Sequence, residues 1–150
     1  MKKFQFRLEA VARWRSAKLE SEENRYRTLV SEDARLKREM EQLDEAAARE
    51  RRAVSENTRI SGTQLAYLHE FQVFAGREMI RLTAEKENLE RQIAEQFQLV
   101  LKERQGVQLL DKLRQKALIE WNTEFHKELQ LLADEAYNAR MLALAREQRR

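Results

Sequence analysis

The sequence predicts an all-α protein: two long helices in an antiparallel coiled-coil hairpin, the second helix being longer, with a C-terminal overhang. Three observations predict this fold. The 150 residues include no proline and only three glycines, too few for the turns of a multi-strand sheet. Charged residues make up 37% of the chain and their signs are interleaved, as on solvated helix faces. Two seven-residue repeats of apolar positions meet near Gly62. We therefore expect a single domain over residues 1–150.

The first repeat predicts a helix from about residue 4 to 57. Two columns of positions run through it, and ten of their fourteen slots hold apolar or aromatic side chains. One column consists of Leu8, Arg15, Glu22, Leu29, Leu36, Leu43 and Glu50; the other consists of Ala12, Leu19, Tyr26, Asp33, Met40, Ala47 and Val54. Such columns between charged positions are typical of the narrow seam of a coiled coil.

The stretch "ENTRISGT" predicts a turn at about residues 58–63. Thr58 and Ile60 are β-branched and therefore weak helix formers. Gly62 can adopt a positive φ, which commonly ends a helix. Either Ser61 or Thr63 is expected to cap the helix that follows.

The second helix is expected from about residue 63 to 148, and ten of its fourteen seam slots are apolar. One column consists of Leu65, Gln72, Met79, Lys86, Ile93, Val100 and Val107; the other consists of Leu68, Ala75, Leu82, Leu89, Gln96, Glu103 and Leu110. After Leu110 the frame is expected to slip to a new set of positions: Leu118, Phe125, Leu132 and Ala139, with Leu129, Ala136 and Ala143 beside them. Such a stutter locally unwinds a coiled coil. Gly76 and Gly106 each weaken the helix by about 1 kcal/mol relative to alanine, so each marks a place where it can bend.

Two helices joined by a short turn are antiparallel neighbours. A turn near residue 61 places Leu43 near Met79 and Phe4 near Leu118. Both helices rise 1.5 Å per residue. The second helix therefore extends about thirty residues beyond the first. That overhang still carries an apolar stripe, Phe125, Leu129 and Leu132. An apolar stripe on an unpaired helix indicates an external partner.

Enzymatic chemistry is not expected from this sequence. The chain has no cysteine, and its two histidines, His69 and His126, lack a second ligand at metal spacing. It has no phosphate-binding glycine loop, and its paired carboxylates lie on exposed helix faces. A two-helix protein also offers no pocket that excludes water. We therefore expect no catalytic residue, no metal and no cofactor.

The patterns of charge and of apolar residues also indicate where the protein resides and which partners it does not bind. Interleaved charges with a net charge of only +3 do not form a nucleic-acid-binding groove. No apolar run approaches the length of a membrane span, so no direct membrane insertion is expected. The basic N-terminus is not a secretory signal, because Arg7, Glu9 and Arg13 interrupt its apolar residues. A cytoplasmic protein is expected.

Three aromatic residues follow the turn at spacings of four and three: Tyr67, Phe71 and Phe74. They lie on one helical face, off the columns that hold Leu68 and Ala75. They either seal the tip of the hairpin or form an exposed docking patch, and we favour docking because they avoid the seam. Trp121 lies where the frame is expected to slip, and it either fills looser packing there or faces a partner.

These features together resemble the FliJ family of the bacterial flagellar type III export apparatus, over nearly the whole chain. The opening "FQFRLEAVARWR" is similar to the family's aromatic-led start, and "ESEENRYRTL" is similar to its first acidic turns. Gly62, Tyr67 and Phe71 fall where the family places its hairpin tip. "LLDKLRQKALIEW" resembles the stretch before the family's last helix. "LADEAYNAR" looks like its terminal Leu-Asp-Glu signature, although Ala133 separates Leu132 from Asp134 here.

The resemblance implies a rod-like central stalk, similar to the γ subunit of rotary ATPases. Family members bind the hexameric flagellar export ATPase and promote its assembly and activity. They also contact the cytoplasmic domain of the export gate and the export chaperones. We assign the ATPase contact to the overhang and the gate contact to the hairpin tip. The ATPase set is Trp121, Phe125, Leu129, Leu132 and Arg140, and the gate set is Tyr67, Phe71 and Phe74. We expect a monomer when the protein is free, and a peripheral position at the cytoplasmic face of the inner membrane when it is assembled.

The sequence is also compatible with two alternative functions. A stalk protein of a virulence-type III secretion system would have nearly the same sequence pattern. A homodimeric structural coiled coil would pair the columns between chains, and the break at Ile60–Thr63 would then be only a hinge. A mass of about 18 kDa in dilute solution would favour the hairpin.

Overall fold

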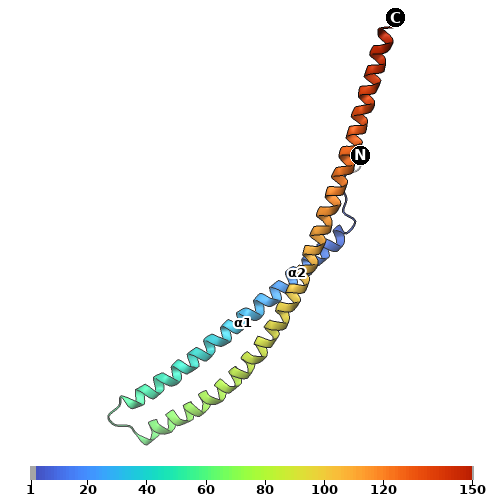
Figure 1. The fold of residues 1–150 in the computed structure, drawn as a ribbon. Helices are drawn as coiled ribbons and strands as arrows, with labels where there is room; N and C mark the ends of the chain where they lie inside the picture. Colours follow the sequence, from blue (N-terminus) through green and yellow to red (C-terminus); the bar gives the residue numbers. More distant parts are fainter. Residues whose placement is uncertain (1–2, 150) are drawn as a thin grey trace. The chain divides into compact units, whose positions relative to one another are not determined.

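The computed structural model describes residues 3–149, and these form two α-helices without a strand. Helix α1 spans Glu9–Ser55 and helix α2 spans Gly62–Glu147 (Figure 1). The two helices pack against each other, which confirms the predicted all-α hairpin with a longer second helix. Contacts divide the chain into two compact units. We call Lys18–Glu103 the hairpin unit, and Met1–Ala17 with Arg104–Arg150 the terminal unit.

The start of α1 differs from the prediction, because the helix begins at Glu9 rather than at about residue 4. Phe4 and Phe6 are half-buried, whereas Lys3, Gln5 and Arg7 are exposed. That alternation has the period of two that characterises an extended segment. The segment therefore buries both phenylalanines without forming a helical turn. Its end is fixed by a hydrogen bond in which the Glu9 amide donates to the Phe6 carbonyl at 3.1 Å.

The turn between the helices is stabilised by a capping box at the start of α2. The Gln64 amide donates to Ser61 Oγ at 3.2 Å, and the Ser61 amide donates to Gln64 Oε1 at 3.1 Å. This reciprocal pair satisfies two amides that the first turn of a helix leaves unpaired. Ser61 is thus the cap, one of the two predicted candidates. Gly62 is the first residue of α2, and no described residue has a positive φ, so the turn does not use the freedom of glycine.

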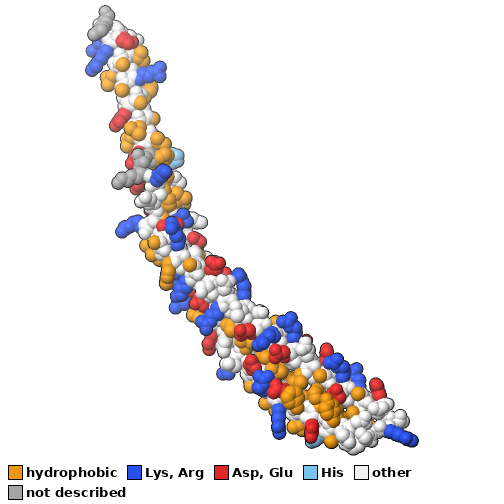
Figure 2. Space-filling model, turned by 180° about the vertical axis from the view of Figure 1, so that it is seen from behind, with side chains coloured by type: hydrophobic (Ala, Val, Ile, Leu, Met, Phe, Trp, Pro, Cys, Tyr) orange, Lys and Arg blue, Asp and Glu red, His pale blue; other side chains and the backbone are white. Residues whose placement is uncertain are grey.

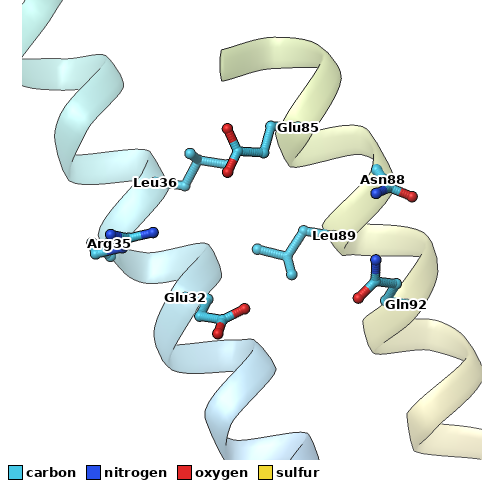
Figure 3. A pocket seen from close by; sticks show the side chains of 7 residues that line it. All are labelled: Glu32, Arg35, Leu36, Glu85, Asn88, Leu89 and Gln92. Atoms are coloured by element: carbon cyan, nitrogen blue, oxygen red, sulfur yellow. The ribbon is translucent and has the colours of Figure 1, made fainter. Parts of the chain in front are cut away.

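The seam of the hairpin unit follows the predicted columns. Leu36, Ala75, Leu82 and Val100 are its buried apolar residues, and Leu36 is only 1% exposed. Figure 3 shows Leu36 and Leu89 extending from opposite helices into the space between them. They lie beside a cleft of about 180 Å³ with polar side chains at its rim. The prediction fails only near the turn, where Leu65 and Gln72 are exposed and Phe71, one position before Gln72, is half-buried instead.

Polar side chains are buried in this seam at three levels, at Asp33, Gln96 and Glu103. Gln96 Nε2 donates to the Glu22 carbonyl at 3.0 Å and also to the Glu22 carboxylate. Glu103 forms an ion pair with Lys18 at 3.1 Å. Asp33 is instead paired with Lys37 on its own helix. A slip of one helix along the other would leave Gln96 and Glu103 unpaired, which costs about 1–3 kcal/mol each. These two polar levels therefore favour one register.

A slip of the seven-residue frame was predicted directly after Leu110, but the structure shows no slip there. Val107, Leu110, Ala117 and Trp121 are all half-buried, and their spacings continue the earlier columns without a break. The slot between Leu110 and Ala117 is taken by Arg114, whose guanidinium lies 3.4 Å from the Glu9 carboxylate. Arg114 is itself exposed, so the column passes through one charged residue at the edge of the seam and continues in the half-buried residues on either side of it.

The register at the N-terminus also differs from the prediction. Phe4 contacts Trp121, with ring centroids 6.0 Å apart, whereas it was predicted near Leu118. An extended segment advances about 3.3 Å per residue against 1.5 Å in a helix. Residues 4–8 therefore extend further along α2 than a helix of the same length. α2 itself is continuous through Gly76 and Gly106.

Candidate partner-binding surfaces

An aromatic cluster lies in the terminal unit where the N-terminal segment meets α2. Phe4 contacts Trp121 edge-on, and Trp121 stacks on Phe125 with ring centroids 5.2 Å apart and an interplanar angle of 19°. His126 lies edge-on against Phe125 at 5.8 Å. A groove of about 670 Å³ runs beside this cluster, between residues 4–8 and α2. Trp121 thus packs against Phe4 of the N-terminal segment.

Beyond the cluster, no described residue of the rest of the chain covers α2. Every described residue from His126 to Arg149 is exposed, and Figure 1 shows this part of α2 as a single helix. The exposed part carries the predicted stripe. We call these positions the terminal stripe: Phe125, Leu129, Leu132, Ala136, Ala139 and Ala143. Phe125 is half-buried and Leu132 is 60% exposed. Arg140 lies next to the stripe and is exposed.

Exposed apolar side chains also lie on the other sides of this segment. They are Leu131, Tyr137, Met141, Leu142 and Leu144, and Figure 2 shows hydrophobic side chains recurring along the C-terminal part of α2. At 100° per residue these positions are spread around the helix axis. These side chains belong to none of the seam columns, so the columns did not predict them. The run "YNARMLALA", which does not keep its apolar residues to one face, was the available signal.

A second surface lies at the tip of the hairpin unit. Tyr67 stacks on Phe71 with ring centroids 6.5 Å apart, and Phe71 contacts Phe74 at 6.4 Å. Tyr67 is 58% exposed and Phe74 is 56% exposed, whereas Phe71 is half-buried at the edge of the seam. Tyr67 also lines a cleft of about 390 Å³ between the helices, together with Ala53 and Val54 of α1. The three aromatic side chains therefore form one contiguous group.

Two ion-paired side chains in the hairpin unit have perturbed pKa values, and both lie outside the two surfaces. The hydrogen bond and the charge of Asp33 raise the pKa of Lys37, whose ammonium lies 2.6 Å from the carboxylate. Glu78 raises the pKa of Arg81, which lies 2.9 Å from it. Both contacts join residues three or four apart on one helix, so they reinforce the helix surface locally.

Within residues 3–149, no group of three or more His, Cys, Asp or Glu side chains is placed to hold a metal ion. No helix in the same range is long and apolar enough to cross a membrane. No protein-family model, curated protein or solved structure matches the chain. The two surfaces are therefore interpreted from their own chemistry.

Proposed function

We propose that this protein is a component of bacterial flagellar protein export, in which it acts as the central stalk of the hexameric export ATPase. The observation that carries the proposal is the exposed segment from His126 to Arg149, which is apolar on several sides. A helix with apolar residues all around its axis is usually buried on all sides. A ring that encloses the segment would cover all of these side chains, whereas a partner on one face would leave some of them in water.

The charge at the end of α2 is compatible with this role. Residues 136–149 contain three arginines, Arg140, Arg146 and Arg149, and one carboxylate, Glu147. A basic end is attracted to an acidic or carbonyl-lined rim. The ATPase itself, rather than some other ring, is proposed because the chain resembles the FliJ family in its opening, its tip and its C-terminal stretch. The protein would act by binding alone, without catalysis of its own.

The hairpin tip is proposed to bind the cytoplasmic domain of the export gate. Tyr67 and Phe74 expose aromatic surface of the kind that dominates binding energy at protein interfaces. In this role the chain connects the ATPase to the gate and to export chaperones, and it resides in the cytoplasm, peripheral to the inner membrane.

The ATPase contact is tested by a variant that ends at Phe125. It lacks every residue of the unpartnered segment and keeps the contacts of Trp121 with Phe4 and Phe125. We expect its helicity by circular dichroism to fall in proportion to the helical residues removed, and its thermal midpoint to change little. Stimulation of the export ATPase should be lost. Normal stimulation by the shortened chain would place the stalk contact elsewhere.

The gate contact is tested by Phe74→Ala, with Val73→Ala as the control because Val73 is an exposed neighbour on another face. Phe74→Ala should weaken gate binding by about 2 kcal/mol or more, measured by calorimetry. It should leave ATPase stimulation and the thermal midpoint nearly unchanged. A clear fall in the thermal midpoint with gate binding intact would instead assign the aromatic group to sealing the tip.

A further inference from the structure

The terminal stripe has the geometry of an unused coiled-coil seam. Its six positions are spaced alternately by four and three residues, as the a and d positions of a heptad are. It follows the seam directly, because Phe125 stacks on Trp121 and Trp121 contacts Phe4. The described N-terminal segment reaches no further than this cluster, so the place of an antiparallel second helix is open from Leu129 onward.

The stripe is graded in side-chain size along its length. Its first three residues are large, Phe125, Leu129 and Leu132, and its last three are alanines, Ala136, Ala139 and Ala143. Helices pack well when large residues face small ones across the interface. An antiparallel copy of the same stripe provides this match at every level. It places Phe125 against Ala143, Leu129 against Ala139, and Leu132 against Ala136.

Charge is graded in the same direction. Residues 120–135 hold five acidic side chains and one lysine, whereas residues 136–149 hold three arginines and one glutamate. An antiparallel copy brings each acidic half beside a basic half, and a parallel copy brings like charges together. We propose that the terminal stripe binds the terminal stripe of a second copy of this chain, antiparallel, about a two-fold axis near Asp134.

The resulting dimer is weak and depends on concentration. Three of the six stripe residues on each helix are alanines, which are small. In addition, Glu135 of one chain lies beside Glu135 of the second copy across the axis, so two like charges are close together. The pairing also covers only one side of a helix that is apolar on several sides. It does not require the proposed ATPase, but it occupies part of the surface that the ATPase would use. Self-association and stalk binding are therefore mutually exclusive.

Sedimentation equilibrium of the full chain tests the pairing. The mass should rise with concentration from 18.0 kDa toward twice that value. Leu132→Asp places a charge in the stripe and should lower the association constant at least about tenfold. Leu131→Asp is the matched control, since Leu131 is the adjacent leucine, 63% exposed against 60%, on another face. It should leave the association constant close to that of the unmodified chain.

The orientation is tested by disulfide trapping, which is specific because the chain has no cysteine. When Leu129→Cys and Ala139→Cys chains are mixed and oxidised, the disulfide should join one variant to the other. The proposal is overturned by a mass that stays at 18.0 kDa at every concentration. Equal weakening by the two aspartate variants, or a predominance of disulfides between two Leu129→Cys chains, also overturns it.

Discussion

Leu36→Ala is the substitution that most directly tests the packing of the hairpin seam. Leu36 is the most buried side chain of the hairpin unit, at 1% exposure. The substitution removes three carbon atoms from the seam, which costs about 2.4 kcal/mol at 0.8 kcal/mol per carbon. The cavity adds little, because a two-helix seam borders solvent and the cleft of about 180 Å³ beside Leu36 lets the helices relax. We expect a loss of about 2.5–3 kcal/mol, in the lower part of the usual range.

Urea unfolding followed by circular dichroism measures this loss, and the thermal midpoint should fall by roughly 5–12 °C. The control is Leu99→Ala, the same substitution at a residue of the hairpin unit that is 47% exposed, and it should cost less than about 1 kcal/mol. A loss below 1 kcal/mol for Leu36→Ala, or equal losses for the two variants, would refute the reasoning that this seam holds the hairpin together.

Three further predictions concern local features. Ser61→Ala removes the cap of α2 and should cost about 1 kcal/mol in urea unfolding, whereas Thr63→Ala should cost less than half of that. Gly76→Ala should stabilise the chain by up to about 1 kcal/mol, since a Cβ there meets no atom within 4 Å. Asp33 raises the pKa of Lys37 above 10.5, so the stabilisation by this pair is complete below that pH and is lost as the pH rises through the raised pKa. The stability difference between the unmodified chain and Lys37→Met should therefore be constant from about pH 6 to 9 and shrink above about pH 10.5; a difference that instead changed near neutral pH would contradict this assignment.

The seam was predictable because burial in a two-helix hairpin depends almost entirely on periodicity. The column through Leu29, Leu36 and Leu43 needs no tertiary information to be placed against another helix. The sequence was misleading where a partner from the other segment decides the outcome. Arg114 interrupts the apolar column and pairs with Glu9, and Phe4 leaves the helix because Trp121 provides an apolar surface for it. Neither contact can be predicted from one column of residues, because each depends on a residue of the other segment.

The candidate surfaces were predictable in part. The length of the second helix predicted a segment without a neighbour. The side chains around its axis, such as Leu131 and Leu142, were missed because they belong to no column. At the tip, spacing placed Tyr67, Phe71 and Phe74 together, but the half-burial of Phe71 depends on how far the seam rotates around α2, which spacing alone does not fix. The identity of a partner does not follow from any of these patterns, because apolar surface is recognised by many proteins.

Hydrogen–deuterium exchange of the full chain, alone and with the hexameric flagellar export ATPase, tests the central claim that the unpartnered end of α2 is the stalk contact. A single helix without tertiary contacts frays, so the amides of residues 126–147 should exchange rapidly in the free chain at concentrations low enough to keep it monomeric. With the ATPase present, their exchange should slow at least about tenfold, while the amides of the hairpin unit keep their rates. Unchanged exchange over residues 126–147 in the presence of the ATPase, or slowing confined to the hairpin unit, would contradict the account.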